Sequence, residues 1–277
     1  MRYAPLSMLL AGILAVAGAA DSRPVTVKGS DTMVIMGQRW AEAYMASHPG
    51  AKIQVTGGGS GTGVAALLNG TTDICNASRQ MKERERKQFQ EKYKAEVVET
   101  PVAMDGIGIY VHTSNPVPAL SLAQIKGIYT GKIRDWKDVG APPGDILLYG
   151  RENNSGTYEF FKEHVMEGKD FAEETQTMPG TASVINAVTK DPMGIGYGGV
   201  AYSKGVKRVP VRKDDASAPI EVTRETVQDR SYPISRFLFC YTSPSLREEG
   251  KAYLDWILGG DGQKVVEDVG YFPIPAK

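Results

Sequence analysis

Short apolar strands alternate with amphipathic helices along most of this 277-residue chain, and this alternation constrains its fold more than any other feature. Strands are expected at 25–27, 52–56 and 73–77. A helix follows each strand, and the first helix carries Trp40 and Tyr44 on one face at helical spacing. Strand–helix alternation predicts a mostly parallel sheet covered by helices on both sides.

The second half of the chain repeats the alternation and then returns to an apolar strand. A long strand is expected at 102–111, and the prolines at 116 and 118 mark a boundary. Residues 204–219 look polar and irregular, and a strand at 236–241 precedes a helical segment. This order predicts two α/β lobes, the second inserted into the first, with two crossing segments as a hinge and a ligand site between the lobes. The expected organisation is 21–110 and 204–277 for lobe 1 and 111–203 for lobe 2.

Composition narrows the function. The chain has 32 basic and 32 acidic side chains, and 42% of its residues are apolar, which is ordinary for a globular protein. A protein that binds nucleic acid would show an excess of basic residues or a stripe rich in Lys and Arg. Because the charges here are balanced, nucleic-acid binding is not expected. Any anion site must therefore be created locally.

The first twenty residues are expected to be a signal peptide rather than part of the fold. Arg2 precedes an apolar stretch at 8–20 that ends in small residues, which is typical of a secretory signal and too short to span a bilayer. The stretch contains no cysteine, so a lipid anchor is not expected. These features predict a soluble protein exported to the periplasm.

Cys75 and Cys240 are the only cysteines. An oxidising compartment would permit a disulfide between them, but buried free cysteines are also common, so the sequence leaves both states open. The two cysteines and three scattered histidines have no zinc-binding spacing. No metal or other cofactor is expected.

Three loops follow the same plan: a strand, a loop of hydroxyl residues and glycine, and a helix start. Helix starts present unpaired N–H groups and the positive end of the helix dipole, which favour an anion. Each loop alone could merely cap its helix. The loops are Ser30-Asp31-Thr32-Met33, the run from Gly57 to Gly63 that contains Ser60, and the segment from Arg151 to Ser155-Gly156-Thr157.

Two arginines strengthen the anion hypothesis. Arg151 lies four residues before Ser155, and its guanidinium fork suits a tetrahedral oxyanion. Arg79 follows the strand at 73–77, at the sheet end where the first two loops are expected. A surface salt bridge is the alternative for Arg79.

Other motifs fit less well. The glycine run lacks the Gly-Lys-Ser/Thr ending of a nucleotide-binding loop, and its loose dinucleotide pattern is unspecific. Thr62 stands where a nucleophile elbow around Ser60 would require glycine. No histidine lies in a recognisable triad context, so an enzyme is not expected.

Taken together, the motifs resemble the periplasmic phosphate-binding proteins of phosphate ABC transporters. The resemblance covers nearly the whole chain after residue 20. It lies in the three loops, in Asp73-Ile74 with Ala77-Ser78-Arg79, in Ile128-Tyr129-Thr130-Gly131-Lys132-Ile133 with Asp135-Trp136, in Gly194-Ile195-Gly196-Tyr197, in Tyr232-Pro233-Ile234-Ser235-Arg236, and in Gly262-Gln263-Lys264 with Val269-Gly270-Tyr271.

The resemblance implies a two-lobed type II periplasmic-binding fold that closes over inorganic phosphate and delivers it, as a monomer, to a membrane permease. Carried over position by position, it implies that hydroxyls, backbone N–H groups and guanidiniums surround the anion. The implied phosphate-binding residues are Thr32, Met33 (through its N–H), Ser60, Arg79, Arg151, Ser155, Gly156 and Thr157, with Ser30 and Asp31 as possible additions.

One departure bears on selectivity. Many members carry an aspartate at the position of Arg79, where it accepts the proton of monohydrogen phosphate, and other branches carry arginine. A guanidinium only donates hydrogen bonds, so the ligand's proton needs another acceptor, such as a hydroxyl or Asp31. We expect affinity to rise with pH across phosphate's second ionisation and sulfate to be rejected less strongly. Sulfate, molybdate or tungstate binding and a secreted phosphoesterase remain alternatives.

Overall fold

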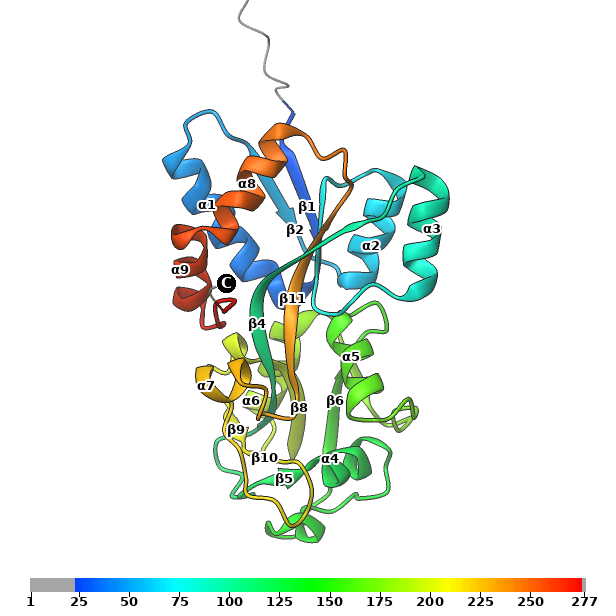
Figure 1. Ribbon diagram of the computed structural model, residues 1–277. Coiled ribbons are helices and arrows are strands. Elements are labelled where there is room, and N and C mark those ends of the chain that lie inside the picture. The colour runs from blue at the N-terminus through cyan, green and yellow to red at the C-terminus, as the bar shows by residue number, and fades with distance from the viewer. Residues whose placement is uncertain (1–22, 276–277) are drawn as a thin grey trace, which may run out of the picture.

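The computed structural model describes residues 23–275, and the expected signal peptide at 1–20 lies outside them. The described chain forms two α/β parts, one above the other in Figure 1, joined by the long strands β4 and β11. No helix within residues 23–275 is long and apolar enough to cross a membrane. The strands are β1 Val25–Gly29, β2 Ile53–Thr56, β3 Ile74–Ala77, β4 Val98–Val111, β5 Leu120–Ser121, β6 Leu147–Arg151, β7 Gln176–Met178, β8 Gly194–Gly199, β9 Lys207–Val209, β10 Val211–Arg212 and β11 Ser235–Thr242.

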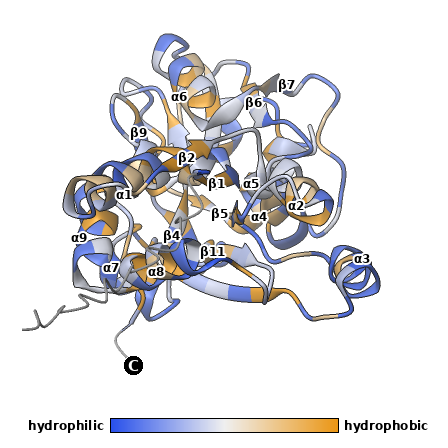
Figure 2. Cartoon of the chain, turned by 90° about the horizontal axis from the view of Figure 1, so that it is seen from above, coloured by the Kyte–Doolittle hydropathy of each residue, from blue (hydrophilic) through white to orange (hydrophobic). Residues whose placement is uncertain are grey.

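Helices cover the sheet, and α1, α2 and α5 begin within or directly after the loops where the sequence predicts helix starts. In α1, buried Met36, Trp40 and Tyr44 recur every four residues, which places them on one face against the core. Figure 2 shows α3 mostly blue, in keeping with its charged sequence. The α-helices are α1 Val34–Ser47, α2 Ser60–Asn69, α3 Glu83–Tyr93, α4 Leu122–Tyr129, α5 Gly156–His164, α6 Gly180–Lys190, α7 Arg224–Gln228, α8 Glu248–Leu258 and α9 Gly260–Val269, and 3-10 turns lie at Asp31–Met33, Trp136–Val139 and Val200–Tyr202.

The strand order explains how both parts share one sheet. The order is β2-β1-β3-β11-β4-β8-β6-β7, and β9 also pairs with β4. β1, β2 and β3 are parallel to one another, as are β6, β7 and β8, whereas β11 and β4 are antiparallel to their neighbours. β4 is buried from Val102 to Val111, because it runs through both cores.

Two short strands lie in the segment that the sequence left irregular. β9 pairs with the end of β4, and β10 pairs with β5. Strands of two or three residues give too little periodicity to recognise from the sequence. The lobe boundaries remain a prediction, and this pairing favours a later return from lobe 2 to lobe 1 than residue 204.

Gly63 allows α2 to pack closely on β1. A Cβ at this position would lie 2.6 Å from the Lys28 carbonyl oxygen and 2.6 Å from the Gly29 Cα. A side chain here would therefore push the helix away from the strand. The glycine keeps the start of α2, with Ser60, close to the loop after β1.

Cys75 and Cys240 are free and buried on neighbouring strands. Cys75 belongs to an apolar cluster with Val64 and Phe89, whereas Cys240 belongs to the main core with Trp40. Their side chains therefore lie in different cores, which resolves the open question in favour of two thiols. Burial raises the pKa of Cys240 to about 12 and that of Cys75 further.

Candidate anion-binding site

Three of the predicted loops converge at the junction of the two parts. Thr32, in the turn after β1, has its Oγ1 2.8 Å from Oγ1 of Thr157, in the first turn of α5. Gly156 lies against the start of α2, because a Cβ at Gly156 would be only 2.2 Å from the Ser60 Oγ. These residues are almost completely buried. The structure thus brings together residues 125 positions apart, as the anion hypothesis requires.

The starts of α2 and α5 lie at the same place, although the Gly61 N–H of α2 donates to the Asn154 carbonyl oxygen at 2.9 Å. α2 begins at Ser60 and α5 at Gly156, so the first turns of both helices meet around the hydroxyls. The N–H groups of a first turn have no partner inside their own helix. Ser155 caps α5, because its Oγ accepts a hydrogen bond from the Tyr158 N–H at 3.3 Å. Its O–H hydrogen remains available to donate.

The turn after β1 is held by two tyrosines and by its own backbone. The Tyr202 hydroxyl donates to the Asp31 carbonyl oxygen, and the Tyr271 hydroxyl donates to that of Thr32, both at 2.7 Å. The Met33 N–H, expected to face the anion, donates to the Ser30 carbonyl oxygen at 3.0 Å. The turn therefore presents two hydroxyls to the cluster: that of Thr32, 2.8 Å from the Thr157 hydroxyl, and that of Ser30, which donates to Ser78 Oγ.

Arg151 ends β6 with its side chain only 1% exposed. Its Nη2 donates to Asp31 Oδ2 and its Nη1 to Thr181 Oγ1, each at 2.8 Å. Burial lowers the pKa of Arg151, and the negative charge of Asp31 opposes this effect. Within residues 23–275, its Nε has no hydrogen-bond partner. This guanidinium therefore has a buried donor to offer to an anion.

Asp31 has a different role from the free acceptor considered from the sequence. Its Oδ2 accepts from Arg151, and its Oδ1 accepts from the Gly58 N–H at 2.7 Å. The carboxylate therefore ties the turn after β1 to both the glycine loop and β6. A hydroxyl is then the better placed acceptor for a ligand proton.

Arg79 is paired with a carboxylate. Its Nη1 and Nη2 each donate to Glu85 of α3 at 2.8 Å, and Nη1 also donates to the Gln80 carbonyl oxygen. Burial would raise the pKa of Glu85, but the hydrogen bonds and charge of Arg79 outweigh it, so the pKa is lowered. The salt bridge considered as an alternative is therefore present, although it is buried. Direct contact between Arg79 and an anion stays a prediction.

Ser78 and Arg236 occur in the motifs quoted from the sequence, but neither was among the binding residues inferred from it. The Ser78 N–H donates to Ser60 Oγ at 3.0 Å, and Ser30 Oγ donates to Ser78 Oγ at 2.9 Å. Arg236 Nη2 donates to Thr157 Oγ1 at 3.0 Å. A single arginine in an apolar strand was the available signal, since a buried charge needs a partner.

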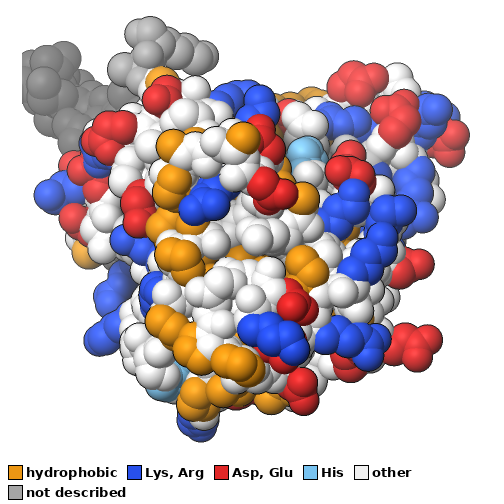
Figure 3. Space-filling view, turned by 90° about the horizontal axis from the view of Figure 1, so that it is seen from below, with side chains coloured by type: hydrophobic (Ala, Val, Ile, Leu, Met, Phe, Trp, Pro, Cys, Tyr) orange, Lys and Arg blue, Asp and Glu red, His pale blue; other side chains and the backbone are white. Residues whose placement is uncertain are grey.

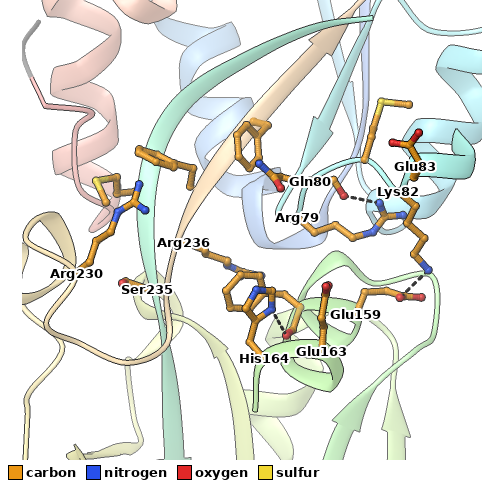
Figure 4. Close-up of a pocket in the computed structure, with 15 residues that line it drawn as sticks. Arg79, Gln80, Lys82, Glu83, Glu159, Glu163, His164, Arg230, Ser235 and Arg236 are labelled. Atoms are coloured by element: carbon orange, nitrogen blue, oxygen red, sulfur yellow. Dashed lines mark hydrogen bonds and ion pairs between the residues drawn. The ribbon is translucent and has the colours of Figure 1, made fainter. Parts of the chain in front are cut away.

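A cavity of about 740 Å³ lies beside the cluster, between α3, α5 and β11. Figure 4 shows Arg79, Lys82 and Glu159 at one side of this cavity and Arg230 at the other. Lys82 and Glu159 form an ion pair of 2.6 Å between the two parts. The residues that line the cavity are Arg79, Gln80, Met81, Lys82, Glu83, Met104, Glu159, Phe160, Glu163, His164, Arg230, Ser235, Arg236, Phe237 and Phe239.

The fold and the converging helix starts define a class, the two-lobed periplasmic-binding proteins of type II. Residues 15–261 match the PBP superfamily domain. The chain is 35% identical to the phosphate-binding protein PstS of Pseudomonas aeruginosa over 90% of its own length and 82% of that protein's. For PstS of Staphylococcus epidermidis the identity is 34%, with 90% and 78% covered.

Comparison with solved structures points to the same class of protein. A substrate-binding protein assigned to a phosphate ABC transporter of Clostridium perfringens, with bound phosphate, superposes with a TM-score of 0.84 at 30% identity, covering 91% of this chain and all of that one. An ABC-type phosphate transport receptor from Vibrio cholerae gives 0.72 at 26%, with the same coverage. The chain belongs to the PstS family of phosphate-binding proteins. The resemblance and fold predicted from the sequence are thereby confirmed.

Proposed function

We propose that this protein captures inorganic phosphate between its two lobes and delivers it to the membrane permease of an ABC transporter. The observation that carries the proposal is the meeting of Thr32, Ser60 and Thr157 beside Arg151, whose Nε–H is buried without a partner in the described chain. Oriented donors in a buried site suit a small oxyanion. The relatives named above are phosphate-binding proteins, which supports the same ligand.

The proposed phosphate-binding set keeps six of the residues expected from the sequence: Thr32, Ser60, Arg151, Ser155, Gly156 and Thr157. The Met33 N–H is engaged by the Ser30 carbonyl oxygen, and contact with Arg79 stays a prediction. Thr32, Ser60, Ser155 and Thr157 donate from hydroxyls, the N–H groups of Gly156 and Thr157 donate from the start of α5, and Arg151 donates from its Nε. Export to the periplasm and action as a monomer without catalysis belong to this proposal.

Over the lower face, seen in Figure 3, basic and acidic side chains are interspersed.

One calorimetric series tests the ligand. The purified chain is titrated with phosphate and, in competition, with sulfate, molybdate and tungstate. We expect phosphate to bind most tightly, and preferential binding of another oxyanion would contradict the proposal. A chromogenic phosphate ester in the same buffer tests the enzyme alternative, because a binding protein should release no chromophore.

A further inference from the structure

Arg236 lies near the start of β11, one of the two strands that join the lobes. It is on β11, directly opposite Asp105 on β4. Its Nε and Nη2 donate to Asp105 Oδ2 at 3.0 and 2.7 Å, and both side chains are at most 1% exposed. Asp105 Oδ1 accepts from the Val200 N–H at 3.0 Å. The pair is thus fixed in the hinge strands by charge-assisted hydrogen bonds.

The same guanidinium contacts both sides of the candidate site. Nη1 donates to the carbonyl oxygen of Ser78, which follows β3, at 2.8 Å. Nη2 donates to Thr157 Oγ1, at the start of α5, at 3.0 Å. Within the described chain, Arg236 therefore links the hinge, the β3 end and the α5 start through one planar group.

This contact determines what the Thr157 hydroxyl can do. A hydroxyl has one hydrogen and two lone pairs. Because Arg236 occupies a lone pair of Thr157, the O–H hydrogen points away from the guanidinium. Thr32 Oγ1, 2.8 Å from Thr157 Oγ1, is one group within reach of this hydrogen.

We propose that Arg236 is a positioning residue of the phosphate site, which orients the Thr157 hydroxyl as a donor and holds the lobes together in the binding geometry. The inference rests on the proposed function. Arg236 acts through Thr157, and Asp105 acts through Arg236. Arg79 does not share this role, because its Nη groups donate to Glu85 and Gln80 instead.

The test uses the charge-matched variant Asp105→Asn/Arg236→Gln, which leaves no buried charge unpaired. We expect its phosphate affinity to fall about 10- to 100-fold, the effect of losing a charge-assisted hydrogen bond. Arg86→Gln/Glu99→Gln is the matched control, because this half-buried ion pair joins α3 to β4 away from the cluster. The control should bind phosphate like the wild type.

A double-mutant cycle separates positioning from general stability. In a Thr157→Val background, the paired substitution should cost less than about threefold further, since the hydroxyl it orients is gone. In a Thr157→Ser background it should cost its full factor. If the paired variant does not fold, Arg236→Lys is the second test. Its phosphate affinity should also fall, because one ammonium cannot replace three differently directed donors.

Two results would overturn the inference. The first is wild-type phosphate affinity in the paired variant or in Arg236→Lys. The second is a loss of affinity in the paired variant that adds fully to the loss caused by Thr157→Val. A wild-type chain that fails to bind phosphate would instead refute the proposed function, and the inference with it. The two failures are distinguished by the wild-type titration, which is read first.

Discussion

Arg151→Ala is the sharpest perturbation of the candidate site. The substitution removes a guanidinium whose side chain is 1% exposed and which makes hydrogen bonds of 2.8 Å to Asp31 and to Thr181. It also leaves the Asp31 carboxylate without its cation, close to the place where the phosphate dianion would bind.

The expected loss follows from that geometry. Truncating one partner of a buried, hydrogen-bonded charge pair costs about 3–5 kcal/mol, which weakens binding roughly 100- to 5,000-fold. Isothermal titration with phosphate measures the change directly. Adding Asp31→Asn to Arg151→Ala should recover part of the affinity, because it removes the remaining negative charge.

The control is Arg134→Ala. Arg134 pairs with Glu174 at 3.1 Å, but its side chain is 73% exposed, and such pairs contribute about 0–1 kcal/mol. Phosphate affinity should be unchanged in this variant. If Arg151→Ala loses less than about tenfold, the reasoning that places Arg151 at the anion is refuted.

Further predictions concern packing, pH and the thiols. Gly156→Ala should abolish phosphate binding in titrations, because its Cβ would lie 2.2 Å from the serine hydroxyl that begins α2, whereas Gly260→Ala, with no atom within 4 Å, should bind normally. The pKa of Glu85 is lowered in the folded state, so its pairing with Arg79 stabilises the protein above the ordinary carboxyl pKa and is lost as the pH falls through the lowered value. Urea melts should therefore lose stability on acidification, and less steeply in Glu85→Gln. Phosphate affinity should rise with pH across the ligand's second ionisation, and a flat or falling series of titrations would contradict this. Both cysteines should resist alkylation in the native protein, and mass spectrometry should find two reacted thiols after unfolding.

Local patterns in the sequence predict most of the site. The run Ser30-Asp31-Thr32 and the glycine loop before Ser60 each end a strand and start a helix, and parallel strands bring such loops to one edge. Strand bounds agree within a few residues, as for the strand expected at 52–56 and observed at Ile53–Thr56. These features depend on neighbours in the chain, so a single sequence contains them.

Contacts between residues far apart in the sequence could not be predicted from such local patterns. Asp105 and Arg236 are 131 positions apart, and only the antiparallel register of β4 and β11 places them opposite each other. Glu85 is six residues from Arg79, but it is one of several charges on α3, and its choice as partner depends on how that helix packs. The sequence therefore singled out Arg79 and Arg151 as site residues, but not Arg236, which donates to Thr157 in the hydroxyl cluster.

The paired charges also explain how a chain with equal numbers of acids and bases can hold an anion. Arg151 is balanced by Asp31, and Arg236 by Asp105, so neither pair adds net positive charge. The attraction must then come from oriented dipoles: helix-start N–H groups, hydroxyl hydrogens and the Nε–H of Arg151, which has no partner among residues 23–275. Dipoles fixed in a buried site discriminate by the position and number of a ligand's acceptors, which a diffuse positive surface cannot do. Selectivity would therefore depend on which hydroxyls are held as donors, and the bond from Arg236 to Thr157 acts on that property.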